Sequence, residues 1–179
     1  MSDVTAAIIA RMRALEARLA ALERRELNLP AGTASLPAVR LAGDSNTGIW
    51  QSAADNLDFS TGGTNRLNIS NTAFAVKNLF VLGDISELHI AEGAITPTCS
   101  RHRVDTEGHA ASDDLTTINC NVEGAILILS SVTFSRVVTL KDGVDNLRLA
   151  GDFALSNSDC IITLVYNYGQ WREISRSAN

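Results

Sequence analysis

Several features of common protein classes are scarce or missing in this sequence of 179 residues. Its three cysteines, Cys99, Cys120 and Cys160, are an odd number without a CxxC spacing, so neither a disulfide framework nor a zinc cage is expected. No apolar run approaches the roughly 20 residues of a membrane span. The N-terminus lacks the basic start and apolar core of a secretory signal. We expect free thiols, no membrane insertion, and a chain made and folded in a cytoplasm.

Basic charge and aromatic side chains are also limited. Lys and Arg number 15 against 20 Asp and Glu, and this acidic balance argues against nucleic-acid binding. Aromatic residues make up 5% of the chain, so Trp50, Trp171, Tyr166 and Tyr168 stand out. The two tryptophans lie beside apolar strand positions and are expected to cover the edge of a core. Tyr168, at a turn beside Gly169, either caps that turn or stacks on a sugar ring.

The N-terminal segment, residues 4–29, predicts a helix with a heptad seam. Its apolar residues alternate at gaps of four and three, and Arg11 and Arg18 beside the seam each have a glutamate five residues later. In a parallel coiled coil these two groups meet on neighbouring chains. The repeated Arg-apolar-x-x-apolar-Glu pattern resembles the motif of short trimeric coiled coils. The predicted trimerisation residues are Ile8, Arg11, Met12, Leu15, Glu16, Arg18, Leu19, Leu22 and Glu23.

The alternative for this segment is a single amphipathic helix packed on its own domain. Against it, the outer positions are mostly Ala, and Pro30 with Gly32 separates the helix from the chain that follows. Three heptads are marginal alone. We therefore interpret residues 1–29 as a coiled-coil trimerisation helix. Its stability would depend on later parts of the same oligomer as well.

Residues 30–93 predict a shaft of short β-hairpins. The period changes from 3.6 to 2, and turn residues recur about every ten positions. Only one face of each strand is apolar, so the region would struggle to close a core by itself, and trimerisation would supply the missing face. The main inward set is Leu57, Phe59, Leu67, Ile69, Phe74 and Val76.

Residues 94–179 have a fuller hydrophobic pattern. Residues 125–129 form an apolar run typical of a strand buried on both faces. Residues 160–166 are expected to face residues 170–175 across a turn. We predict an antiparallel β-sandwich or small barrel, so the chain as a whole is mainly β.

Two clusters of polar residues could suggest a catalytic or metal-binding site. His102, Asp105 and His109, with Ser100, suggest a metal site or a hydrolase, but their spacing matches no zinc motif and no nucleophile elbow surrounds any serine. We expect polar faces of a strand followed by a solvated loop.

The second group is Asp113 and Asp114, with Glu107 upstream, which suggests a carboxylate pair for glycan cleavage. Adjacent residues on a strand point to opposite faces, and a turn or cap is the simpler interpretation. No catalytic residue, metal site or cofactor is predicted.

Residues 41–50 carry Gly43-Asp44 and the run 47–50, Thr-Gly-Ile-Trp, and residues 57–69 carry Thr61-Gly62-Gly63 before Arg66. This pair of segments resembles one common in the fibre proteins of tailed bacteriophages and related particles. Residues 104–108, 113–118, 147–151 and 171–177 are similar to the C-terminal β domain of many such fibres. The resemblance covers most of the chain beyond residue 40 and implies a trimer.

Together these observations predict a non-enzymatic homotrimeric fibre or spike subunit on the surface of a phage-like virion, assembled in the host cytoplasm beside other virion proteins. It would attach to a host surface glycan or receptor. The candidate ligand-binding residues are Tyr168, Glu107, Asp113 and Asp114. Two alternatives remain: a structural decoration or adaptor protein, and a capsule-degrading spike that uses Asp113, Asp114 or the histidines.

Overall fold

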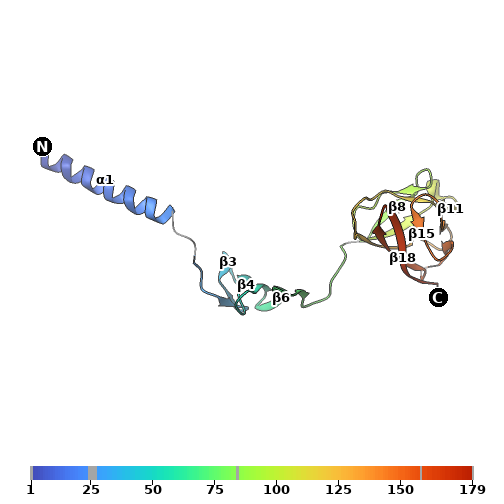
Figure 1. Ribbon diagram of the computed structural model, residues 1–179, viewed down its shortest axis with the longest axis horizontal. Helices are drawn as coiled ribbons and strands as arrows, with labels where there is room; N and C mark the ends of the chain where they lie inside the picture. Colours follow the sequence, from blue (N-terminus) through green and yellow to red (C-terminus); the bar gives the residue numbers. More distant parts are fainter. Residues whose placement is uncertain (1, 24–27, 84, 158, 179) are drawn as a thin grey trace. The chain divides into compact units, whose positions relative to one another are not determined.

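The computed structural model describes residues 2–23, 28–83, 85–157 and 159–178. The protein is mainly β, and it divides into two compact units, Met1–Phe80 and Val81–Asn179 (Figure 1). The predicted boundary at residues 93 and 94 is therefore too late. Strand β8 (Ser86–His89) pairs with β10 (Arg101–Asp105), and this pairing ties residues 86–89 to the second unit.

The N-terminal helix α1 spans Ser2–Glu23. The predicted end at Leu29 is wrong, because Leu29 has no helical conformation. It precedes Pro30, whose ring disfavours the α conformation of the residue before it. Residues 24–27 lie outside the described part of the chain, as do the side chains of Leu22 and Glu23.

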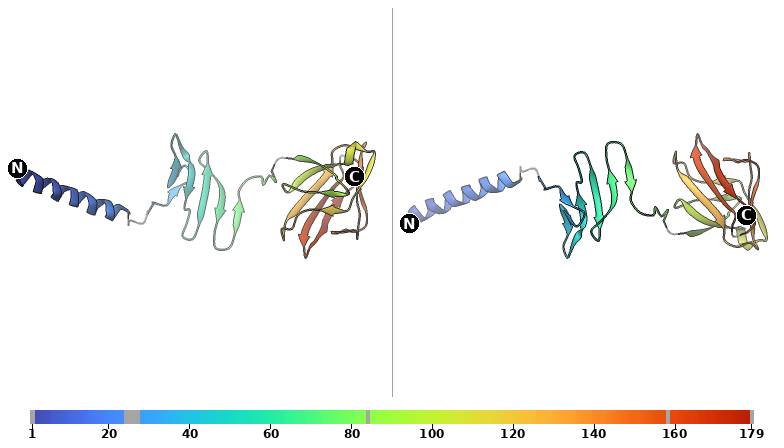
Figure 2. Two further views of the ribbon diagram at one scale, coloured as in Figure 1. Left: turned by 90° about the horizontal axis from the view of Figure 1, so that it is seen from above. Right: turned by 90° about the horizontal axis from the view of Figure 1, so that it is seen from below.

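The rest of the first unit is a single antiparallel meander. A short β1–β2 ladder precedes a five-stranded sheet whose strands pair in chain order, and both views in Figure 2 show that sheet as one layer. The elements are β1 (Gly32–Thr33), β2 (Leu36–Pro37), β3 (Val39–Leu41), β4 (Asp44–Trp50), β5 (Leu57–Thr61), β6 (Thr64–Ile69) and β7 (Phe74–Val76).

Two glycine sites explain why the meander forms here. Gly62 and Gly63 both have positive φ, 57° and 73°, and they make the two-residue turn that joins β5 to β6. Gly48 lies where β4 approaches β3 so closely that a Cβ atom would fall 1.9 Å from the carbonyl oxygen of Val39. The hairpin predicted across the Gly-Gly corner is confirmed.

The second unit is a short solenoid whose chain returns to the same face in the same direction. On one face β8, β10 and β13 lie parallel; on the others β11 pairs parallel with β14, and β9 with β12. The further elements of these circuits are β9 (Ala94–Ile95), the 3-10 helix η1 (Glu107–His109), β11 (Ser112–Leu115), β12 (Thr117–Ile118), β13 (Ile126–Ser131), β14 (Val137–Leu140) and β15 (Leu147–Arg148).

Three final strands close this solenoid. β16 pairs antiparallel with β14, while β17 pairs antiparallel with both β13 and β18. Their bounds are β16 (Phe153–Leu155), β17 (Ile161–Asn167) and β18 (Gln170–Ser177). The predicted facing of residues 160–166 and 170–175 is confirmed, but the purely antiparallel sandwich is wrong, because the pairs between successive circuits are parallel.

All residues of the buried hydrophobic core described here belong to this second unit. Inward positions such as Leu127 and Leu129 are fully buried, whereas Ile126 is exposed, so the strand predicted to be buried on both faces is buried on one. Trp171 is 1% exposed and donates its Nε1–H to the carbonyl oxygen of Ile118 at 3.1 Å. That tryptophan covers the core as expected.

Candidate functional site

The predicted acidic loop is held together by its own backbone. Asp113 accepts hydrogen bonds from the Glu107 N–H at 2.8 Å and the Asp114 N–H at 2.9 Å. Glu107 accepts one from the Glu92 N–H at 3.2 Å. Asp113 therefore fixes the loop between β10 and β11, and Glu107 ties that loop to the turn before β9. Asp113 and Asp114 extend from opposite faces of β11. This geometry favours the turn interpretation over a catalytic pair.

Tyr168 occupies the tip of the β17–β18 hairpin. Its φ is 52° and its side chain is 85% exposed, so the predicted exposed ring is confirmed. This tip lies beyond the start of β13, because Val165 pairs with Ile126, whereas Glu107 follows the end of the parallel strand β10. At about 3.3 Å per residue, the strands separate the two tips by at least about 15 Å. The four predicted ligand-binding residues do not form one site.

A charged cluster centres on Asp105 at the end of β10. The carboxylate is 1% exposed and receives two hydrogen bonds from Arg136, Nε at 2.6 Å and Nη2 at 2.8 Å. His109 Nδ1 lies 2.9 Å from Oδ2, and the Thr106 N–H donates to Oδ1 at 2.9 Å. The Arg136 bonds, helped by those from His109 and Thr106, outweigh burial and lower the pKa of Asp105 to about 2.

Histidines flank this carboxylate in a way that resembles a metal site. His89, Asp105 and His109 place one ligand atom each within 4.8 Å of one another, and the two imidazole rings are 5.3 Å apart. However, Arg136 already occupies both carboxylate oxygens, and its fixed positive charge would repel a cation. The cluster acts as an ion-pair network that fixes the turn after β10 and the approach to β14.

His102, which precedes Asp105 by three residues, points into the unit instead. It is fully buried, and its Nε2 accepts hydrogen bonds from the N–H groups of Thr98 and Cys99, both at 3.1 Å. Its Nδ1 lies 2.8 Å from the Ser86 hydroxyl. Ser100 is the other member of the predicted polar cluster. Its carbonyl oxygen accepts a backbone hydrogen bond from the Ile128 N–H at 2.8 Å. The fold therefore separates His102 and Ser100 from Asp105, whereas His109 stays in contact with Asp105. The buried His102 also departs from the expected polar face of the strand.

Two of the residues that meet Asp105, His89 and Arg136, were missed from the sequence, whereas His109 was already grouped with it. His89 is its register neighbour on the parallel strand β8, and Arg136 follows 31 residues after it, just before β14. Both contacts come from stacking of successive circuits, and no local motif signals them.

In the first unit the polar face of the sheet is organised by Asp58. This carboxylate is fully buried and accepts hydrogen bonds from the Ser52 N–H and Oγ at 2.8 and 2.6 Å, and from the side-chain amides of Asn65 and Asn68 at 2.7 and 2.8 Å. Burial alone would raise the pKa of Asp58, but these bonds outweigh it and hold the pKa below its usual value. The network ties the loop after β4 to β5 and β6.

The opposite face of the same sheet is apolar. One row of cross-strand partners runs through all five strands, and a shorter row lies beside it. The first row is Val39, Ile49, Phe59, Leu67 and Val76, and the second is Leu57, Ile69 and Phe74. The six residues predicted to point inward therefore share one face, yet Phe74 is 66% exposed and Leu57 is 45% exposed.

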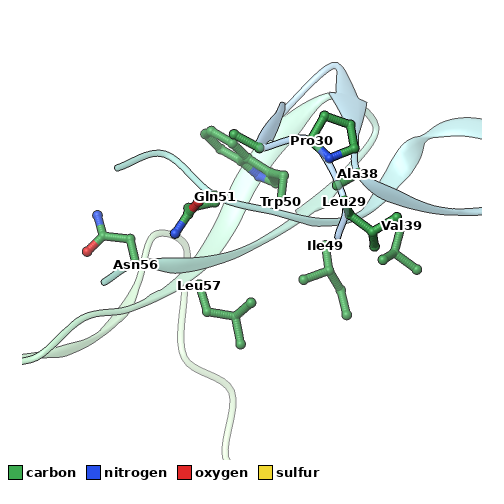
Figure 3. A pocket seen from close by; sticks show the side chains of 10 residues that line it. Leu29, Pro30, Ala38, Val39, Ile49, Trp50, Gln51, Asn56 and Leu57 are labelled. Carbon is green, nitrogen blue, oxygen red and sulfur yellow. The ribbon is translucent and has the colours of Figure 1, made fainter. Parts of the chain in front are cut away.

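A hollow of about 290 Å³ opens at one edge of this sheet, between the chain preceding β1 and strands β3 to β5 (Figure 3). Val39, Ile49 and Leu57 extend to one side of the strands, and Trp50 extends to the other. Trp50 buries its Nε1–H without a hydrogen-bond partner among the described residues. Leu29 is 43% exposed beside it. The hollow is an unfilled apolar edge and contains no charged group.

The seam residues of α1 are also open to solvent. Ile8, Met12, Leu15 and Leu19 are 53 to 62% exposed. Within the described part of the helix, the side chains of Arg11, Glu16 and Arg18 form no ion pair. These groups are free to meet other chains.

None of the helices described is both long and apolar enough to cross a membrane. No family model matches the sequence, and no curated protein or solved structure resembles it closely enough to count as a match.

Proposed function

We propose that this protein is the subunit of a homotrimeric fibre or spike on a phage-like particle, and that its second unit attaches to the surface of the host cell. The observation that carries the proposal is the contrast between the two units. The second has a closed hydrophobic core, whereas the first presents an apolar sheet face and an apolar helix seam to solvent.

The uncovered sheet face supports assembly with copies of the same chain. Apolar area buried from water contributes about 25 cal/mol per Å². Eight apolar side chains in two adjacent rows form a patch that a monomeric protein rarely leaves exposed. Asp58 and its hydrogen-bonding partners occupy the other face, so we expect the apolar face to be the one that another chain covers.

The charges beside the helix seam also favour assembly with copies of the same chain. Arg11 and Arg18 flank the seam on one side, and Glu16 lies on the other, which is the arrangement that pairs neighbouring parallel helices. A trimer would shield Ile8, Met12, Leu15 and Leu19 between three helices.

The residues that connect the two units also favour a trimer. Leu79, Phe80 and Val81 follow β7 in irregular conformation and are 92, 71 and 72% exposed. Three consecutive exposed apolar residues are a liability in a monomer. In an interwoven trimer they would meet their counterparts from the other two chains.

The attachment role of the second unit rests on its self-contained fold and on the resemblance to phage fibre proteins. Fibres gain affinity by offering three copies of one weak site to a repetitive surface, since linked sites raise effective concentration without new contacts. The capsule-degrading alternative is disfavoured, because Asp113 and Asp114 extend from opposite faces of β11 and Asp113 caps backbone N–H groups.

Fluorescently labelled full-length protein applied to a panel of bacteria tests this proposal. We expect saturable binding to some strains, and weaker binding by a chain lacking residues 1–29, which loses the three-fold avidity. Retention on the particle with no cell binding would favour the adaptor alternative. Release of reducing sugar from bacterial polysaccharide would favour the enzyme.

A further inference from the structure

A groove on the outer face of the second unit is distinct from every predicted site. It has a volume of about 420 Å³ and lies across β10, β13 and the start of β17. Its lining residues include Arg101, Arg103, Ser130, Phe134 and Ile161. Arg103 is the register partner of Ser130, which in turn pairs with Ile161, so one cross-strand row forms its floor.

The two arginines face the groove together. Strand residues alternate between faces, so Arg101 and Arg103 are exposed while His102 and Val104 are buried. Their Cα atoms are therefore about 7 Å apart along the strand. Among the described residues, no carboxylate forms an ion pair with either guanidinium. Two unpaired guanidinium groups at this spacing can hold one planar carboxylate between them.

The remaining lining suits a sugar ring. Phe134, in the turn after β13, is 72% exposed, and an exposed aromatic face can stack on the C–H face of a pyranose. The Ser130 hydroxyl has no hydrogen-bond partner within the described residues, so it is available to a ligand hydroxyl. Ser131 is not available, because it is buried and donates to the Asn157 carbonyl oxygen at 3.2 Å.

We propose that this groove, named here the Arg101–Phe134 groove, binds a saccharide that carries a carboxylate. Arg101 and Arg103 would receive the carboxylate, Phe134 the ring and Ser130 a hydroxyl. The inference rests on the proposed attachment function for its setting, and it names the ligand class. The chain carries a net charge of −5, so general attraction of polyanions is not expected and binding depends on these local groups.

Glu87 does not line the groove, but its register pairing with Arg103 makes it a sensitive control. Glu87 on β8 is the register partner of Arg103, but their side chains form no ion pair. Its charge competes with an incoming carboxylate for Arg103. Glu87→Gln should therefore strengthen binding, an effect that a non-specific loss of structure would not produce.

The probe is polygalacturonate, with its fully methyl-esterified form as the neutral match, immobilised and presented to the full-length protein. We expect binding to the acid form, loss of binding to the ester, and at least about tenfold weaker binding by Arg101→Gln/Arg103→Gln. Arg13→Gln/Arg172→Gln removes the same charge from exposed positions outside the groove and should stay within about twofold. Phe134→Ala, at an exposed position, tests the stacking contact independently.

The proposal for the groove is overturned if the protein binds the acid and the ester equally. It is also overturned if the Arg101 and Arg103 double variant binds polygalacturonate as well as the parent does. Cell adsorption separates the two proposals. If the double variant adsorbs to bacteria like the parent, the groove is refuted as the attachment site while the attachment proposal stands. If the parent binds polygalacturonate but adsorbs to no cells, the groove stands and the attachment proposal fails.

Discussion

Replacing Asp105 by Asn should remove a pH-dependent part of the stability of the second unit. Asparagine has nearly the shape of the protonated acid, so the variant imitates the carboxylate at low pH. The pKa of Asp105 is lowered from 3.8 to about 2, chiefly by Arg136 and then by His109 and Thr106, against the opposing effect of burial. Each pKa unit corresponds to about 1.4 kcal/mol, so the shift is worth about 2 kcal/mol.

The sign follows from the direction of the shift. The folded state binds the Asp105 proton more weakly than the unfolded chain does. The extra stability is therefore fully present above the unfolded pKa of about 4 and is lost as pH falls toward 2. We expect Asp105→Asn to cost about 2 kcal/mol near neutral pH. The difference between parent and variant should vanish toward pH 2.

Urea unfolding followed by tryptophan fluorescence can measure this difference. The chain has two tryptophans, and a Trp50→Phe background leaves the buried Trp171 as the reporter of the second unit. Asp152→Asn is the matched control, since Asp152 pairs with Lys141 on the surface and should change stability little. A parent-minus-variant difference that stays constant from pH 7 to pH 2 would refute the assigned role of Asp105.

Three further changes have defined outcomes. Gly48→Ala should separate β3 from β4, because the new Cβ would lie 1.9 Å from the Val39 carbonyl oxygen; loss of the Trp50 fluorescence transition with an intact second unit checks this. His102→Ala removes a fully buried ring that accepts hydrogen bonds from two part-buried N–H groups, each bond contributing about 0.5–1.5 kcal/mol, and urea unfolding should show a loss of at least about 1–3 kcal/mol. Leu15→Asp/Leu19→Asp should dissociate the oligomer without melting the second unit, which sedimentation and far-UV circular dichroism can distinguish.

Local pattern predicted the first unit well. The Gly62-Gly63 turn and the period-2 alternation act between neighbours in sequence, so the β5–β6 hairpin and the shared apolar face could be read directly. The end of the helix was misplaced, because the heptad count ran past the effect of Pro30 on the preceding residue.

The solenoid of the second unit could not be predicted in the same way. Alternating burial looks the same in an antiparallel sandwich and in stacked parallel circuits. The distinction lies in pairs such as Arg101 with Ile128, which are 27 residues apart and carry no local signal. The prediction of Tyr168 as an exposed turn residue succeeded because its environment is local. Its grouping with Glu107 failed because it required the direction of β10 relative to β17.

The missed groups likewise lie on different circuits of the solenoid. Arg136 meets Asp105 only because one circuit stacks on the previous one. The sequence predicts Arg101, His102 and Arg103 as polar faces of a strand, which is confirmed for the exposed arginines and wrong for the buried His102. The Phe134 turn beside the arginines belongs to the next circuit.

The central claim is that the first unit is completed by two further copies of the chain. Size-exclusion chromatography with multi-angle light scattering at micromolar concentration tests it most directly. The account predicts a single species with three times the 19.1 kDa mass of the chain. A monomer or dimer under these conditions would contradict it, because the apolar sheet face and the helix seam would then be exposed or differently covered.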